Sequence, residues 1–279
     1  MNCVSRRIEY GSRADVFRVV FLSDVHLGTR YCDEALLRQT VQSIADDPHA
    51  YWLGLGDYCE WINRKDPRAD EETLAKWLHG RKDIAGLQTT MIGEALRPIA
   101  DKCLGMIKGN HEYTIEQHTE RSVYDDLVNG LLDTRDGRAG IRLGPNGFVT
   151  LQFSRKTGET RGSTWSCTLY ATHGCSGGRK MGSKALRLTD IHATVEADVV
   201  VMGHTHTPMW FPTERQVSGR RKVAELRTCH LINAGSFLGT DQLGWPEYAR
   251  VKDYPPTQAR VVALEITPDK HRIEFVGKA

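Results

Sequence analysis

Residues 17–26 are Phe17-Arg-Val-Val-Phe-Leu-Ser-Asp-Val-His26, a run of β-branched and aromatic residues that stops at an aspartate and a histidine. A short apolar run of this kind is typical of a strand buried on both faces of a sheet. Asp24 and His26 are two residues apart, and side chains at that spacing on an extended chain point to the same side. The segment therefore predicts a buried strand with a carboxylate and an imidazole together at its carboxyl end.

Four further apolar runs end in the same kind of polar cluster. They lie at 51–55, 103–107, 166–172 and 199–202, and the clusters after them are Gly56-Asp57, Gly109-Asn110-His111-Glu112, His173 and Gly203-His204-Thr-His206. Each cluster alone is a weak signal, because a turn or a hydrogen-bonded surface pair explains it equally well. Together the five clusters hold five of the chain's eleven histidines. Such a conjunction predicts one shared metal site.

The order of these runs predicts a layered α/β fold. A helical pattern begins at Glu34, with Asp33 placed as its N-cap, and residues 70–101 carry apolar residues at the spacing of one long helix or two shorter ones. Strand, cluster, helix and strand in alternation are typical of a βαβ arrangement, in which reactive groups gather beyond the carboxyl ends of the strands. Strands expected at 148–153, 166–172, 199–202, 224–232 and 261–266 predict a second sheet packed on the first within one domain.

Composition narrows the class of protein. Hydrophobic residues make up 40% of the 279 residues, enough for a buried core, and the formal net charge of +2 neither demands nor excludes a nucleic-acid partner. The amino-terminal residues lack the apolar segment of a secretory signal, and no apolar run reaches the length that spans a bilayer. Seven cysteines occur without C-x-x-C pairs. We therefore expect a reduced, cytoplasmic protein without a membrane partner.

The clusters supply imidazole and oxygen donors and no thiolate. This donor set suits Mn²⁺, Fe or Zn²⁺ in a reactive centre and disfavours a structural zinc site built from cysteines. In their order along the chain, the clusters resemble the motif set of the calcineurin-like metallophosphoesterase superfamily. The resemblance spans residues 24–206, and Asn233-Ala-Gly-Ser236 is similar to a later motif that usually has Pro where this chain has Ala.

The resemblance implies a fold and a metal centre. The fold would be a four-layer α/β/β/α sandwich of two mixed β-sheets flanked by helices, formed by a single domain over residues 1–279. The seven metal ligands would be Asp24, His26 and His206 on one ion, Asn110, His173 and His204 on the other, and Asp57 as the bridge between them. Two divalent ions are expected, Mn²⁺ first, with Fe, Zn²⁺ or Ni²⁺ as alternatives. Their shared water, deprotonated to a bridging hydroxide, would attack a phosphoester in line.

Further residues are expected around these ligands. By resemblance, His111 would contact the phosphoryl group or protonate the leaving oxygen, and Glu60 would orient His111; a solvated loop carboxylate is the alternative for Glu60. Arg30, Arg179 and Lys180 would bind a polyanionic substrate. A flexible solvated loop is the alternative for Arg179 and Lys180.

Two departures from relatives bear on the substrate. Trp61 stands where protein Ser/Thr phosphatases of the superfamily have a phosphate-binding Arg, and His111 stands where pyrophosphatases of the lipid A pathway have Arg. The first disfavours a phosphoprotein phosphatase, and the second favours the phosphodiesterase and nuclease branch of the superfamily. Because the Gly/Arg/Lys loop after His173 favours a small closed pocket, we expect a phosphodiesterase acting on a nucleotide or cyclic nucleotide. The alternatives are a DNA or RNA nuclease, a phosphomonoesterase, or a non-catalytic scaffold that has kept the fold. The physiological substrate and the oligomeric state stay open.

Overall fold

The strand that begins at Phe17 lies at the centre of a sheet. In the computed structural model, which describes residues 2–62, 71–119, 121–132, 140–157, 160–175, 178, 180–218, 223–239 and 258–277, this strand is β2 (Phe17–Leu22). Its sheet has the order β12-β11-β2-β3-β4-β5, and the other members are β3 (Ala50–Gly54), β4 (Cys103–Ile107), β5 (Arg142–Gly144), β11 (Val262–Thr267) and β12 (Arg272–Val276). Strands β2 to β5 run parallel, whereas β11 and β12 pair antiparallel.

A second mixed sheet packs on the first. Its order is β1-β6-β7-β8-β10-β9, from β1 (Asn2–Tyr10), β6 (Asn146–Thr157), β7 (Thr160–Thr172), β8 (Val199–Met202), β10 (Ala224–Asn233) and β9 (Met209–Ser218). Strand β8 lies between β7 and β10 and runs parallel to both. The carboxyl ends of β7 and β8 therefore lie at the same edge of this sheet.

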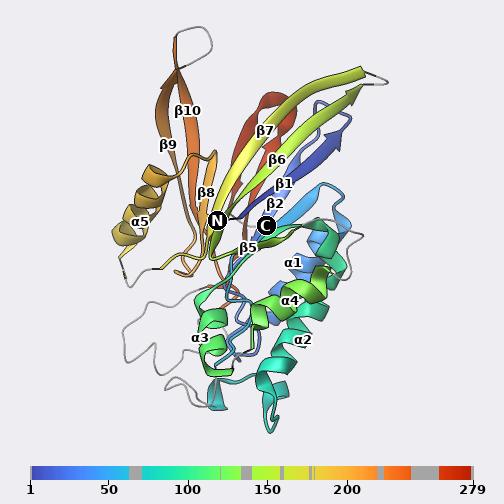
Figure 1. Ribbon diagram of the computed structural model, residues 1–279, viewed down its shortest axis with the longest axis vertical. Coiled ribbons are helices and arrows are strands. Elements are labelled where there is room, and N and C mark those ends of the chain that lie inside the picture. The colour runs from blue at the N-terminus through green and yellow to red at the C-terminus, as the bar shows by residue number, and fades with distance from the viewer. Residues whose placement is uncertain are drawn as a thin grey trace.

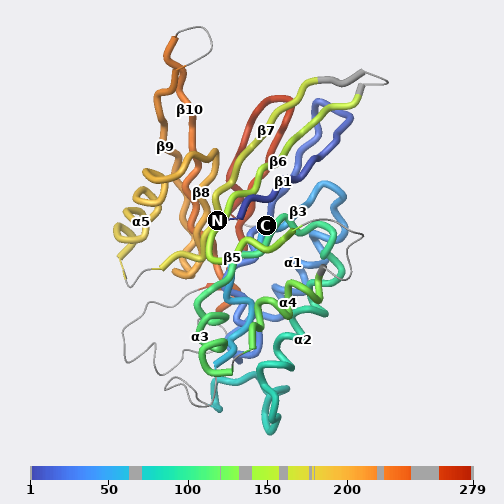
Figure 2. The backbone as a smooth tube through the Cα atoms, in the orientation of Figure 1, coloured from blue at the N-terminus to red at the C-terminus, as the bar shows by residue number. Residues whose placement is uncertain are grey.

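Helices cover the outer face of each sheet, as Figures 1 and 2 show. The first sheet carries α1 (Glu34–Asp46), α2 (Ile84–Leu96), α3 (Asn110–Thr119) and α4 (Val123–Leu132), and the second carries α5 (Met181–Thr194). Strand β2 shows why its sequence is continuously apolar. Phe17, Val19 and Phe21 belong to the core between the sheets, whereas Val20 and Leu22 pack in the core beneath the helices. The four-layer α/β/β/α sandwich is confirmed, but the strand expected at 261–266 in the second sheet is β11 of the first sheet, where it pairs antiparallel with β2.

The helix predictions are partly right. Asp33 caps α1 as expected, and its side chain accepts a hydrogen bond from Leu36 N–H at 2.9 Å. The expectation of one long helix or two over 70–101 is wrong in its first half. There the described residues form short 3-10 turns, Glu71–Thr73 and Lys76–Leu78, and the α-helix begins only after Asp83, which caps it. The chain continues past α2 as a 3-10 turn with a proline in its first turn, where the missing N–H costs no hydrogen bond.

The described residues contain no helix long and apolar enough to span a membrane.

Candidate metal centre

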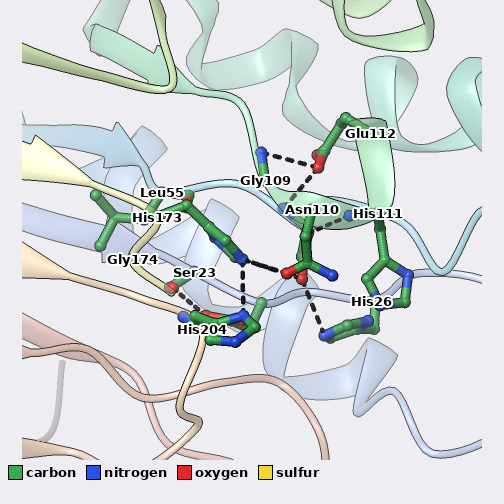
Figure 3. Close-up of polar contacts among 12 residues, drawn as sticks. Ser23, His26, Leu55, Gly109, Asn110, His111, Glu112, His173, Gly174 and His204 are labelled. Carbon is green, nitrogen blue, oxygen red and sulfur yellow. Dashed lines mark hydrogen bonds and ion pairs between the residues drawn. The ribbon is translucent and has the colours of Figure 1, made fainter. Parts of the chain in front are cut away.

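Seven side chains that are distant in sequence meet in one cluster at the carboxyl ends of five strands. Asp24 and His26 follow β2, Asp57 follows β3, Asn110 follows β4, His173 follows β7, and His204 and His206 follow β8. Figure 3 shows side chains from several of these loops pointing toward one another. The structure thus brings together all seven residues that the sequence analysis predicts as metal ligands, and this cluster is called the metal centre below.

One half of the metal centre is formed by Asp24, His26 and His206. The Nε2 atoms of His26 and His206 are 3.3 Å apart, and Nε2 of His206 is 3.1 Å from Oδ1 of Asp24. That oxygen is buried and has no partner in good hydrogen-bond geometry among the described residues. Two ring nitrogens and a carboxylate oxygen this close together form a donor set for one cation.

The other half centres on His173. Its Nε2 atom is 2.9 Å from Oδ1 of Asn110 and 3.3 Å from Nδ1 of His204. The same nitrogen lies 3.2 Å from Oδ2 of Asp57. Since that Asp57 oxygen is also 3.9 Å from Nε2 of His26, the carboxylate lies between the two halves. This is the place from which a single carboxylate can serve two cations.

Contacts outside the cluster fix the direction of the imidazoles. Nδ1 of His26 lies 2.8 Å from the Glu60 carboxylate, and Nδ1 of His173 lies 2.7 Å from the backbone carbonyl oxygen of Leu55. Both partners accept hydrogen bonds, so each Nδ1 carries the proton. In the neutral rings the Nε2 lone pairs then face the centre, which is how metal-binding histidines are usually held. The residues present therefore fit divalent metal ions.

The charges of the cluster are strongly coupled. Burial by itself raises the pKa of Asp24, but His206 and His173 together outweigh it and hold the pKa at about 2. Burial lowers the pKa of His173, yet Asp57 and Asp24 outweigh this effect and raise the pKa to about 10. Buried carboxylates thus demand positive charge here, and a cation that binds to His173 must displace a proton.

The backbone is strained at the same residues. Five of the seven have positive φ angles, namely Asp24 (51°), His26 (49°), Asp57 (52°), His204 (67°) and His206 (53°). For a residue other than glycine, the left-handed conformation costs roughly 1–2 kcal/mol. Such strain persists where the surrounding structure enforces it, and it gathers at functional sites. The strain indicates that the loops hold these side chains in place at the expense of stability.

Two glycines let the loops after β3 and β4 approach each other. Gly56 has a φ of 95°, and a Cβ atom there would lie 2.6 Å from the backbone nitrogen of Gly109. A Cβ atom at Gly109 would collide with both the backbone and the side chain of Asp57. The glycines before Asp57 and Asn110 are therefore required by this close contact.

Glu112 is a site residue to which the sequence analysis assigned no role. Its side chain is fully buried and accepts hydrogen bonds from the backbone N–H groups of Asp57 (3.1 Å), Tyr58 (3.1 Å) and Gly109 (3.0 Å). Burial, followed by the nearby Asp57 charge, raises the pKa of Glu112 to about 8. The signal available in the sequence was the position of a carboxylate directly after Asn110 and His111, at the end of a buried strand.

His111 lies beside the metal centre and is buried. Its ring is 4.7 Å from the ring of His26, in an edge-to-face arrangement, and its backbone N–H donates to Oδ1 of Asp57 at 2.9 Å. The expected orientation of His111 by Glu60 needs a correction. The backbone carbonyl oxygen of Glu60 contacts Nδ1 of His111, whereas the Glu60 carboxylate contacts Nδ1 of His26 in the loop after β2.

The residues predicted to bind substrate lie outside the metal centre or outside the described residues. Arg30 is exposed, its guanidinium donates to the backbone carbonyl oxygen of Glu72 at 3.4 Å, and it lies over the ring of Tyr31. Lys180 is exposed directly before α5, and Arg179 lies outside the described residues. No contact of Arg30 or Lys180 with the seven clustered side chains occurs among the residues described.

A family model for the calcineurin-like phosphoesterase matches residues 17–208 of this sequence. A metallophosphoesterase from Sphaerobacter thermophilus is similar in structure, with 14% identity over 93% of this chain and 87% of that chain and a TM-score of 0.37. Vps29 from Entamoeba histolytica complexed with Zn²⁺ has 12% identity over 93% and 97%, with a TM-score of 0.34. An uncharacterized protein from Streptococcus pneumoniae, a predicted phosphoesterase, has 11% identity over 95% and 99%, with a TM-score of 0.34. No curated protein matches by sequence.

Proposed function

From the premise that this chain belongs to the calcineurin-like phosphoesterase family, we propose that it is a phosphodiesterase for a nucleotide or cyclic nucleotide. Membership makes the chain a hydrolase of phosphoric esters, and the clustered donors make divalent metal ions its cofactors. Beyond this, we propose that the bond cleaved is a phosphodiester, that the substrate is a nucleotide or cyclic nucleotide, and that the metal is Mn²⁺. The support for the proposal is the convergence of seven imidazole, carboxylate and amide donors, six of them gathered around Asp57.

In this proposal Asp24, His26 and His206 hold one ion, Asn110, His173 and His204 hold the second, and Asp57 is shared. Divalent ions in such a centre supply Lewis-acid polarisation of a phosphoryl oxygen and of the attacking water. The chain's own contribution is to hold the metal-binding side chains in fixed positions. Hydrogen bonds to Glu60 and Leu55 hold two imidazoles in fixed orientations, so that little reorganisation is needed when substrate binds.

His111 has the second role. Its Nδ1 faces the Glu60 carbonyl oxygen, so Nε2 is the atom left for substrate. We assign this nitrogen to the phosphoryl group or to the leaving oxygen, where proton donation is typically worth about 10²–10⁴-fold in rate. Trp61 is buried beside this loop, in place of the phosphate-binding Arg of related protein phosphatases. An indole at this position lacks the paired, charged donors with which the Arg binds phosphate, which disfavours a phosphoprotein as substrate.

A substrate panel tests the proposal. Metal-stripped protein is supplied with Mn²⁺, Ni²⁺, Zn²⁺ or Mg²⁺ and assayed on bis-p-nitrophenyl phosphate, p-nitrophenyl phosphate, cyclic nucleotides, plasmid DNA and single strands. We expect metal-dependent cleavage of the small diesters, greatest with Mn²⁺. Preference for plasmid or single strands would replace the proposal with a nuclease, and preference for p-nitrophenyl phosphate with a monoesterase.

The variant Asp57→Asn separates an enzyme from a scaffold. It should lose turnover and metal binding, whereas Asp190→Asn, on the exposed face of α5, should retain both. Unchanged turnover in Asp57→Asn would overturn the mechanism, and absence of turnover with every metal would favour the non-catalytic alternative. The cytoplasmic location remains a proposal, supported by the finding that all seven cysteines are free thiols.

A further inference from the structure

A polar cavity lies beside the sheet of β7 to β10, at the other end of β8 from the metal centre. Its volume is about 250 Å³, and Thr168, His192, Asp198, Arg215 and Arg227 are among the residues that line it. Asp198 directly precedes β8, whereas His204 follows its carboxyl end. At a rise of about 3.3 Å per residue, the two ends are on the order of 15 Å apart. The cavity is therefore separate from the metal centre.

The cavity exists because β8 is short. Val199, its first residue, pairs with Leu169 of β7 and His230 of β10, so both neighbours continue beyond the start of β8 without it. Figure 1 shows the β6–β7 and β9–β10 hairpins diverging past this point. The end of α5 and the segment before β8 lie at the base of this fork, where their side chains line the opening.

Two arginines face each other in the cavity wall. Arg215 on β9 and Arg227 on β10 are directly paired in the antiparallel register, so their side chains project from the same face. Like charges directly opposite each other destabilise a sheet. Glu196 lies 3.4 Å from Arg227, but both side chains are mostly exposed, and such a pair is weak. An anion between the guanidinium groups would remove the repulsion.

His192 adds an unused donor. Its Nε2 atom lies 3.3 Å from the Thr213 hydroxyl and 3.4 Å from a guanidinium nitrogen of Arg215, which can only donate. Nε2 is therefore the acceptor and Nδ1 carries the proton. Nδ1 is buried and has no hydrogen-bond partner in the part of the chain that the structure describes. Burial, followed by the charge of Arg215, lowers the pKa of His192, which keeps the ring neutral in this form.

The cavity wall also carries a negative charge. The carboxylate of Asp198 lines the same cavity, and its Oδ2 atom accepts a hydrogen bond from the backbone N–H of Thr168 at 2.8 Å. A ligand that is anionic throughout would be repelled by this group. A ligand with a donor group at its second end would be attracted by it.

We propose that this cavity binds a small molecule with an oxyanion, phosphate or carboxylate, at one end and an amino or hydroxyl group at the other. Arg215 and Arg227 recognise the oxyanion, His192 holds the Arg215 guanidinium through Nε2 and its backbone carbonyl oxygen, and Asp198 accepts from the second end. Guanidinium groups bind either oxyanion through paired hydrogen bonds. The volume lies below the range of about 300–1,000 Å³ typical of pockets for drug-sized ligands, which restricts the occupant to a small metabolite.

Titration calorimetry on the metal-stripped full chain tests the site. Without metal ions, the metal centre does not contribute anion binding to the signal. The probes are ethanolamine phosphate, glycine and inorganic phosphate. If ethanolamine phosphate binds more tightly than glycine, the oxyanion is a phosphate; if glycine binds more tightly, it is a carboxylate. We expect saturable binding of one of them, tighter than that of inorganic phosphate. It should weaken tenfold or more in Arg215→Gln and in Arg227→Gln, since each loses charge-assisted hydrogen bonds. Arg38→Gln, at an exposed position on α1, is the matched control.

A second readout follows His192 directly. In a nitrogen–proton spectrum of the histidine side chains, the probe should shift the Nδ1–H signal of His192. Absence of saturable binding of all three probes would overturn the proposal, as would equal binding by wild type and both cavity variants. Because Arg227 is mostly exposed, its variant retains the fold even if Arg215→Gln does not. None of these outcomes depends on the phosphodiesterase activity.

Discussion

The carboxylate of Glu60 lies 2.8 Å from Nδ1 of His26, a residue 34 positions earlier in the chain. The contact joins the loop after β3 to the loop after β2 and directs the other ring nitrogen of His26 toward His206. The backbone carbonyl oxygen of the same glutamate contacts His111. One residue therefore orients a metal-centre imidazole with its side chain and the neighbouring imidazole with its backbone.

Removal of the Glu60 carboxylate should weaken metal binding without loss of the fold. We expect Glu60→Ala to bind Mn²⁺ about 10–100-fold more weakly than wild type, the usual effect of removing a group that supports a metal-binding histidine. Calorimetric titration of metal-stripped protein measures the affinity. Glu225→Ala, at an exposed position of β10, should bind Mn²⁺ like wild type. An unchanged affinity in Glu60→Ala would show that His26 is held without this contact.

Glu112 should contribute mainly to stability. Glu112→Ala removes the acceptor of three backbone N–H groups, and each buried donor left unpaired costs about 1–3 kcal/mol. We expect a loss of several kcal/mol in the free energy of unfolding, measured by urea denaturation, and a smaller loss for Glu112→Gln, which keeps one acceptor oxygen. Glu94→Ala, exposed on α2, is the control. Equal stability of Glu112→Ala and this control would contradict the role.

Lys184 supports the loop that carries two of the metal-centre histidines. It is buried, and its ammonium group donates to the backbone carbonyl oxygen of Thr205 and to the hydroxyl of Thr207. Thr205 lies between His204 and His206, both of which have positive φ. Lys184→Met should therefore weaken Mn²⁺ binding about tenfold, since each such bond to a charged group contributes about 1.5–3 kcal/mol.

The neighbouring Lys180→Met provides the comparison for Lys184, because Lys180 is exposed one turn earlier. Its Mn²⁺ affinity should match that of wild type. If Lys180 binds substrate as predicted, the variant raises KM for the diester while kcat is retained. Wild-type metal affinity in Lys184→Met would show that the loop holds its strained conformation unaided.

His230 should make stability depend on pH. Burial lowers its pKa below 6.5, and Nδ1 of its ring accepts a hydrogen bond from the indole N–H of Trp210 at 3.2 Å. In the unfolded chain the pKa is about 6.5. The stabilising contribution is therefore fully present above pH about 6.5 and is lost as the pH falls through the lower pKa of the folded state.

A comparison with His230→Gln isolates this effect. The stability advantage of wild type over the variant, from urea denaturation in the presence of a chelator, should be greater at pH 8 than at pH 5. The chelator removes the separate pH dependence of metal binding. A difference that stays constant across this range would show that His230 titrates alike in the folded and unfolded chains.

The sequence by itself predicted the alternation of strands and helices and the members of the central cluster, although it assigned the strand at 261–266 to the wrong sheet. Residues 17–22 are apolar at every position but one because β2 is buried on both faces, and this local property predicted a central strand. The residues after such strands could be named as one group because parallel strands end at a common edge. Asp33 could also be predicted as a helix cap, because capping is a local property that depends only on the next three residues.

Tertiary structure alone decided the contacts that join distant loops. The Glu60 carboxylate reaches His26 rather than His111, and Glu112 gathers N–H groups from a loop 54 and 55 residues away. The apolar spacing after residue 70 did not produce a helix until Asp83 supplied a cap. Hydrogen bonds of this kind depend on where the backbone turns, and the positive φ angles at Asp24, His26 and Asp57 are strained conformations that persist because the surrounding fold enforces them. The polar side chains of the cluster can be named from the sequence, whereas the hydrogen bonds between them depend on how the loops pack in the folded chain.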